Sequence, residues 1–151
     1  SNNHERDLYE IGPIVIDNAQ DERYFTYLRD GEGQKNVILG DARLKLQEVQ
    51  DKRYGIMFLD AYSSDSLPIH LLTDEAFQLY LSKLKDNGIL AFNITNRHLN
   101  LKPVLAKFVE KYNLKAYRKT TEASDRDYSI YLLSSSEWVI MVRSSSDLPS
   151  T

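Results

Sequence analysis

The stretch that decides the fold is YGIMFLDAYSSDSLPIHLL, residues 54–72, in which an apolar run leads into a polar loop. The run at residues 56–59 is short enough for one buried strand, and Asp60 follows it directly. The loop adds a second carboxylate, Asp65, and the aromatic Tyr62. Open α/β sheets place ligand-binding groups just past the carboxyl ends of their strands. The stretch therefore predicts either an anionic binding site or an ordinary solvated turn, since Ser and Asp are common turn residues.

Outward from this strand, apolar runs alternate with stretches of helical spacing. Such alternation predicts an α/β protein with a mostly parallel sheet and right-handed crossovers. The last two strands have no clear helix between them, so an antiparallel edge hairpin is expected. The expected strands are residues 8–11, 37–40, 56–59, 89–94, 115–119 and 138–143. The expected helices are residues 14–28, 42–49, 73 to the Asn-Gly pair at 87–88, and 100–112.

Three successive strands end in, or reach, an acidic residue: Glu10, Asp41 and Asp60. Acids at the same end of neighbouring parallel strands converge on one crevice. The same positions also suit helix caps and turns, which favour Asp and Ser for their short polar side chains. The pattern thus leaves a binding site and a purely structural role both open.

Composition narrows the function classes. The 151 residues are 42% apolar and 27% charged, as in an ordinary soluble globular protein of one domain. A net charge of −3 offers no basic surface for nucleic acid, and there is no cysteine for disulfides or thiolate chemistry. No apolar run approaches the roughly 20 residues of a membrane span. The three histidines lack a ligand spacing, so no metal is expected.

Four motifs together resemble the spermidine synthase-like family of polyamine aminopropyltransferases. They are YEIGP (9–13), LGDAR (39–43), LDAYSSDSLPIHLLT (59–73) and ITNRHLNL (94–101), and the resemblance extends over residues 8–143. It is nearest to the bacterial branch that is often fused to membrane-transporter-like segments. The resemblance implies a Rossmann-like class I methyltransferase sheet. It also implies transfer of an aminopropyl group from decarboxylated S-adenosylmethionine to a polyamine such as putrescine, with release of methylthioadenosine.

The resemblance implies that three residues bind the nucleoside of the donor. Glu10 matches the acid that accepts hydrogen bonds from the ribose hydroxyls, which suits a carboxylate with two acceptor oxygens. Asp41 matches the acid that binds the adenine amine, and the backbone of Ala42 lies beside the ring.

It also implies roles in the loop after residue 59. Asp60 matches the catalytic acid that holds the attacking amine and helps to remove its proton. Asp65 is expected to hold the distal ammonium of a diamine, and Tyr62 to stack on the ligand.

The chain departs from the family at its start. The Gly-rich loop, the central strand before it and the amino-terminal β-hairpin domain have no counterpart, and Gly12 stands where a second acid is usual. The loop 60–65 is longer than the DSSDP of authentic synthases. The chain therefore resembles a carboxyl-terminal fragment that lacks the first strand of the sheet. We expect residues 1–6 to be disordered or cloning-derived, 7–143 to form the partial domain, and 144–151 to be a flexible tail.

Alternative functions remain open at this point. One is a methyltransferase that uses S-adenosylmethionine, and another is a non-catalytic module that binds a nucleoside, a polyamine or a protein. Without the first strand, two sheet edges are left for another chain, so a homodimer and little activity in this chain alone are expected. The expected partners are a small polyamine and a nucleoside, without nucleic acid or membrane contact. The expected location is the cytoplasm, or the cytosolic domain of a larger membrane protein.

Overall fold

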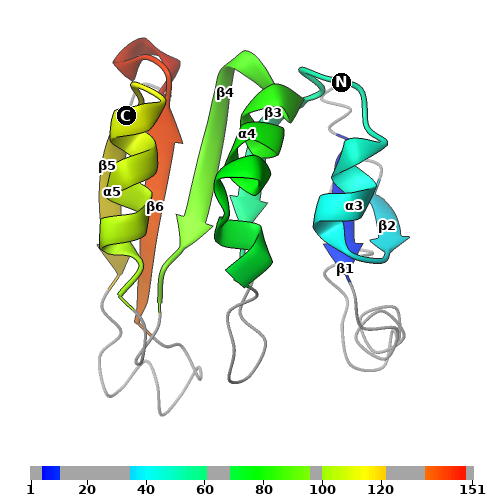
Figure 1. Ribbon diagram of the computed structural model, residues 1–151, viewed down its shortest axis with the longest axis horizontal. Helices are drawn as coiled ribbons and strands as arrows, with labels where there is room; N and C mark the ends of the chain where they lie inside the picture. The colour runs from blue at the N-terminus through cyan, green and yellow to red at the C-terminus, as the bar shows by residue number, and fades with distance from the viewer. Residues whose placement is uncertain (1–4, 11–34, 61–68, 96–99, 122–134, 149–151) are drawn as a thin grey trace. The chain divides into compact units, whose positions relative to one another are not determined.

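The computed structural model describes residues 5–10, 35–60, 69–95, 100–121 and 135–148 (Figure 1). The chain divides into two units, Ser1–Val49 and Gln50–Thr151. The expected helix at residues 14–28 lies outside the described residues.

The first unit contains two parallel strands and one short helix. Strand β1 (Arg6–Glu10) pairs with β2 (Lys35–Leu39), so that Glu10 lies opposite Leu39. The backbone amide of Gly40 donates to the Glu10 carbonyl at 2.9 Å and extends the ladder. Gly40 has a φ of 136°, a conformation that favours glycine, and it turns the chain from β2 into α3 (Ala42–Gln47).

The second unit contains a four-stranded sheet in the order β3-β4-β6-β5. Strands β3 and β4 are parallel, whereas β6 is antiparallel to both of its neighbours. Strands β3, β4 and β5 therefore run in one direction and β6 in the opposite one, which confirms the mostly parallel arrangement and the antiparallel edge hairpin of β5 with β6. The strands are β3 (Tyr54–Leu59), β4 (Leu84–Asn93), β5 (Lys115–Thr121) and β6 (Ser136–Val142), with 3₁₀ turns η1 (Ile69–Leu72) and η2 (Ser145–Asp147).

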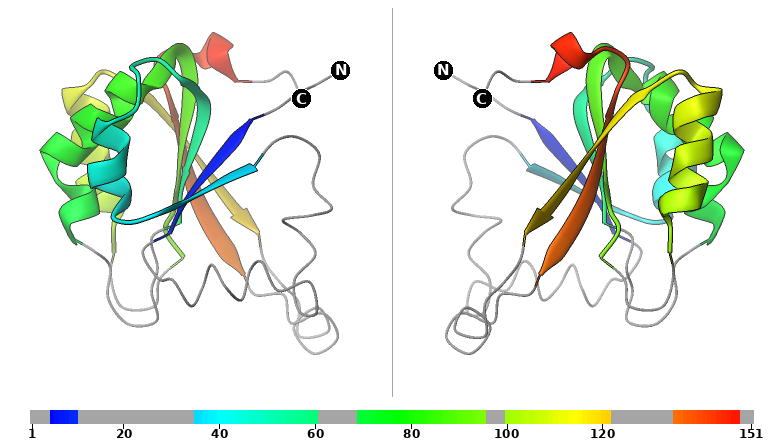
Figure 2. Two further views of the ribbon diagram at one scale, coloured as in Figure 1. Left: turned by 90° about the vertical axis from the view of Figure 1, so that its right-hand side faces the viewer. Right: turned by 90° about the vertical axis from the view of Figure 1, so that its left-hand side faces the viewer.

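One face of this sheet is covered by α4 (Asp74–Lys83) and α5 (Lys102–Lys111), as Figure 2 shows. Phe77 of α4 is fully buried, and its ring stacks on Phe108 at 4.4 Å and on Phe92 at 5.9 Å between centroids. Leu90 and Met141 complete this layer from the sheet side and are also buried. Burial of such large side chains is the main favourable term for the unit.

The opposite face of the sheet is partly bare. Phe58 is 67% exposed and Ile56 is 52% exposed, although both belong to the apolar run that forms β3. Phe58 packs edge-to-face on Trp138 with 6.0 Å between ring centroids. Among the described residues, the outer strands are β1 and β2 in the first unit and β3 and β5 in the second, and each of these pairs with a single neighbouring strand.

The structure corrects the expected end of the helix after residue 73. Thr73, at the start of the expected helix, is its N-cap, since its hydroxyl accepts from the Ala76 amide at 3.3 Å. The helix ends at Lys83, before the Asn-Gly pair, and β4 begins at once. Gly88 instead serves a tight bend inside β4, where a Cβ would lie 2.9 Å from the Lys85 carbonyl oxygen.

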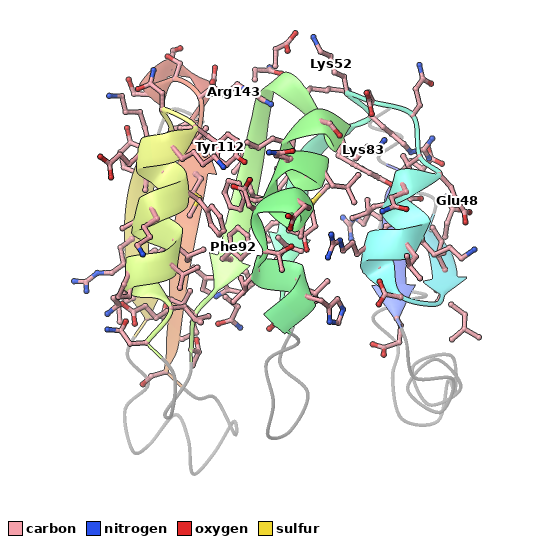
Figure 3. The ribbon with its side chains drawn as sticks, viewed as in Figure 1. Glu48, Lys52, Lys83, Phe92, Tyr112 and Arg143 are labelled. Carbon is pink, nitrogen blue, oxygen red and sulfur yellow. The ribbon has the colours of Figure 1, made fainter. Side chains whose placement is uncertain are left out.

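Arg143 binds one carbonyl group in the last turn of this helix and one at the start of β4. Its guanidinium donates to Leu81 O and Lys85 O, each at 2.8 Å, and its position is marked in Figure 3. A cation at the carboxyl end of a helix also suits the helix dipole. The end of α4 is therefore determined by a residue 60 positions away, which local sequence patterns do not reveal.

Helix α5 starts near the expected residue. Asn100 precedes the N-cap position and its side chain accepts from the Lys102 amide at 3.2 Å. The apolar spacing at residues 104, 105, 108 and 109 predicts the inward face of this helix, and Leu105 and Phe108 are buried as that spacing predicts. The prediction that Val104 is also inward is wrong, because this side chain is 38% exposed.

Candidate functional site

The acids expected to bind the nucleoside lie at one end of the first unit. Glu10 is the last residue of β1 and is half-buried. Asp41 follows β2 by two residues, and the hydrogen bond from Gly40 to Glu10 joins the two strand ends. The parallel pairing therefore brings Glu10, Asp41 and Ala42 to the same carboxyl edge, as open α/β sheets do at ligand sites.

The structure shows that Asp41 is also the N-cap of α3. Its Oδ1 accepts from the backbone amides of Arg43 at 2.9 Å and Leu44 at 3.1 Å. These amides have no partner inside the helix, so the cap stabilises the turn that follows β2. The helix-cap interpretation is thus confirmed for Asp41, and it holds the carboxylate in a fixed direction.

Asp60 lies at the carboxyl end of the β3–β4 pair in the second unit. It follows β3 directly and is exposed. The Nδ2 group of Asn93 donates to Asp60 Oδ1 at 3.0 Å, while Asn93 Oδ1 accepts from the Thr95 amide at 2.9 Å. Asn93 was not anticipated from the sequence, although a polar residue within the apolar run 89–94 was a visible signal. The residues expected beside Asp60, namely Tyr62 and Asp65, lie outside the described residues.

The residues after β4 are held by the start of β6. Glu137 N donates to Thr95 Oγ1 at 2.7 Å, and Ile94 N donates to Glu137 O at 2.8 Å. The Glu137 carboxylate forms ion pairs with Lys102 at 2.9 Å and Arg118 at 3.4 Å. Hydrogen bonds and ion pairs therefore connect Asp60 through Asn93 and Thr95 to Glu137, and from there to α5 and β5.

An open groove of about 480 Å³ lies elsewhere, on the helix-covered side between α5 and the hairpin. Its apolar lining includes Leu105, Val109, Ala116 and Val139. None of Glu10, Asp41 or Asp60 lines it. The chemistry of the strand ends and this groove are therefore separate features.

The clearest pKa shifts belong to the contact between α4 and α5. A hydrogen bond from Lys111 Nζ at 2.7 Å, with a second from Tyr112 Oη at 2.8 Å, lowers the pKa of Asp74. The same hydrogen bond to Asp74 raises the pKa of Lys111. Because this pair joins two helices away from the strand ends, its role is to stabilise their packing.

Two further observations concern metals and membranes. Within the described ranges, no three His, Cys, Asp or Glu side chains are grouped so that they could hold a metal ion. In the same part of the chain, no helix is both long and apolar enough to cross a membrane.

Comparison with known proteins adds one sequence relative. No family model matches the chain. A polyamine aminopropyltransferase of Vibrio vulnificus (strain CMCP6) is 33% identical over 89 residues, which are 58% of this chain and 28% of that protein. The chain thus spans little more than a quarter of the curated relative it matches.

Solved structures identify the fold. A spermidine synthase in complex with the transition-state analogue AdoDATO superimposes with a TM-score of 0.68 at 12% identity, over 95% of this chain and 49% of that one. Human methyltransferase-like protein 13 in complex with SAH gives 0.67 at 19% identity, over 96% and 64% of the two chains. The chain has a class I methyltransferase-like fold, and it is similar in sequence and fold to the spermidine synthase-like polyamine aminopropyltransferases.

Proposed function

We propose that this chain belongs to an enzyme that transfers an aminopropyl group from decarboxylated S-adenosylmethionine to a polyamine such as putrescine. The observation that supports this most is Asp60, an exposed carboxylate held at the carboxyl end of β3 by Asn93. It stands in a chain whose curated relative is a polyamine aminopropyltransferase. An exposed carboxylate at this end of an α/β sheet is suited to a cationic amine.

Asp60 would perform two tasks in this reaction. Its negative charge attracts and orients the acceptor amine, and it takes up the proton that the amine loses on attack. The new N–C bond forms as the C–S bond of the donor sulfonium breaks, and the electron pair leaves with methylthioadenosine. Alignment of the amine with that bond supplies much of the rate enhancement, since orientation replaces a costly encounter.

On the donor side, we propose that Glu10 accepts from the ribose hydroxyls and that Asp41 and the Ala42 backbone bind adenine. Their shared position at the carboxyl edge of β1 and β2 supports this assignment. Asp41 also caps α3, so the cap would hold its carboxylate in place before the nucleoside arrives. Asp65 and Tyr62 stay predictions for the amine side, and so does the meeting of all three acids in one crevice.

A second candidate function is methyl transfer from S-adenosylmethionine. The likeness to methyltransferase-like protein 13 in complex with SAH, with a TM-score of 0.67, favours a ligand related to S-adenosylmethionine in general. The fold is common to both reactions, so the fold alone does not choose between them. Because the chain spans about half of the spermidine synthase structure, we further propose that it is inactive by itself.

Calorimetric titration of the chain with methylthioadenosine and with S-adenosylhomocysteine tests the donor site. We expect methylthioadenosine to bind and Glu10→Gln to weaken it about tenfold or more, because the variant loses a charged acceptor. Glu48→Gln is the matched control, since Glu48 is an exposed acid of the same unit that pairs with Lys45.

The outcomes separate the candidates. Tighter binding of S-adenosylhomocysteine than of methylthioadenosine would favour the methyltransferase. Absence of binding for both ligands at millimolar concentration would instead favour the non-catalytic module.

A further inference from the structure

The side-chain amide of Asn93 has one possible orientation in this structure. Its oxygen must face Thr95, because the Thr95 backbone amide can only donate, and the distance is 2.9 Å. The NH₂ group is therefore turned toward Asp60, whose Oδ1 it reaches at 3.0 Å. In the flipped amide, the oxygen of Asn93 would face the carboxylate of Asp60 and its NH₂ group would face the Thr95 amide, so both hydrogen bonds would be lost.

The surroundings of Asn93 hold it in place. It is the last residue of β4, where the pairing of Leu59 with Phe92 continues into Asp60 beside Asn93. Thr95, whose amide donates to the Asn93 oxygen, in turn accepts at its Oγ1 from the Glu137 amide at 2.7 Å. The amide of Asn93 is thus supported by the sheet on one side and by the start of β6 on the other.

Asp60 has little other support. Among the residues that the structure describes, Asn93 is its one hydrogen-bond partner, and the carboxylate is exposed. A carboxylate without a partner rotates about its side-chain torsions and presents either oxygen to a ligand. The hydrogen bond from Asn93 engages Oδ1, so Oδ2 is left as the oxygen that meets a ligand from outside.

We propose that Asn93 is a positioning residue that orients Asp60 so that Oδ2 receives the acceptor amine and its proton. The inference rests on the proposed function for the identity of the ligand. The hydrogen bond between Asn93 and Asp60 does not depend on the proposed function, because it joins two strand ends of the structure without any ligand. Asn93 acts only through Asp60 and touches neither donor nor acceptor.

Nuclear magnetic resonance on the isotopically labelled chain tests the contact without any activity. Asp60→Ala should shift the Asn93 side-chain NH₂ signals and the Thr95 amide signal. The Asn36 side-chain signals should stay in place, because Asn36 donates to Glu5 and Asp7 in the other unit. Asn93 signals that do not move in Asp60→Ala would overturn the proposal.

Steady-state kinetics on the full-length enzyme tests the consequence. Asn93→Ala should lower kcat by about 10- to 100-fold, the size expected when a reacting group is misplaced by up to about 1 Å. The KM for decarboxylated S-adenosylmethionine should stay unchanged. Asn87→Ala is the matched control, since Asn87 is an exposed asparagine in the other half of β4.

The two experiments have distinguishable failures. A normal kcat in Asn93→Ala, in an enzyme that transfers aminopropyl groups, would overturn the positioning role even if the contact is seen. A wild-type enzyme that transfers no aminopropyl group would refute the proposed function and the amine-orienting role together. The resonance shifts would then still decide whether Asn93 holds Asp60.

Discussion

Asp41 and Asp60 follow parallel strands in the two units, yet the structure holds their carboxylates in different ways. Asp41 is bound by two backbone amides of the helix that it starts. Asp60 is bound by one side-chain amide from the neighbouring strand and stays exposed. The backbone amides of α3 fix the direction of the Asp41 carboxylate, so replacing Asp41 also removes a helix cap. The contact from Asn93 engages Oδ1 of an exposed carboxylate, and exposure suits a group that must gain and lose a proton.

The largest expected effect concerns Asp60. In the full-length enzyme, Asp60→Asn should lower turnover by roughly two to four orders of magnitude, because the amide cannot accept the amine proton. Donor affinity should change little. In a radiolabel transfer assay, Asp41→Asn should show the opposite pattern, with weaker donor binding and a smaller loss at saturation. Equal turnover of Asp60→Asn and wild type would remove Asp60 from the mechanism, and with it the proposed difference in role between Asp41 and Asp60.

The next effect concerns the outer strands β1 and β3, each of which pairs with a single strand among the described residues. An unpaired edge with apolar side chains is a template for another chain, so we expect the purified chain to form a dimer. Phe58→Lys places a charge on the exposed face of β3 and should raise the dimer dissociation constant about tenfold or more. Leu8→Lys does the same on β1 and shows which unit forms the contact. Sedimentation of the wild-type chain as a monomer would contradict this expectation.

A smaller effect is expected from the cap. Asp41→Ala should destabilise the first unit by about 1 kcal/mol, the usual cost of losing an N-cap carboxylate. Hydrogen exchange should speed up at the Arg43 and Leu44 amides, which the cap protects. Asp60→Ala should leave exchange in α3 unchanged. Unaltered exchange in Asp41→Ala would show that the carboxylate is not needed for the local fold.

The smallest effect concerns an acid that we assign no chemical role. The pKa of Asp74 is lower in the folded chain because of Lys111 and Tyr112, so its stabilising effect is present above the ordinary pKa of about 3.9. It is lost as the pH falls through the lowered value. Lys111 stays charged throughout, since its pKa is raised. Thermal melts from pH 6 to pH 2 should therefore show a shallower acid decline for Asp74→Asn than for wild type, and parallel curves would refute this.

The strands, their order in the chain and the edge hairpin follow from hydrophobic patterning, and the structure confirms them. The strand-end positions of Glu10, Asp41 and Asp60 could also be predicted, because a polar residue after an apolar run marks a strand end. Asn93 and Arg143 could not be assigned their roles in this way. Both act on partners more than 30 residues away, and such contacts depend on the register of β4 and β6 rather than on local spacing.

Two other differences have local causes. The Asn-Gly pair at residues 87–88 is typical of a helix end, but here it bends a strand, because the helix has already ended at Lys83, where Arg143 binds the Leu81 carbonyl. Val104 fits the apolar spacing of α5, yet the helix turns Leu105 and Phe108 to the sheet and leaves Val104 outside. A four-residue apolar period marks a stripe on a helix but not which edge of that stripe is covered.

The sheet order β3-β4-β6-β5 has a consequence for how the chain is made on the ribosome. The strand that is last in sequence lies in the interior of the sheet, between β4 and β5. When β5 has been synthesised it has no neighbour to pair with, and β6 follows only after another 14 positions, from Thr121 to Ser136. At typical synthesis rates that delay is on the order of a second, during which two strand edges stay open. A chain stopped before Ser136 would lack β6, and β5 would then have no strand to connect it to β4.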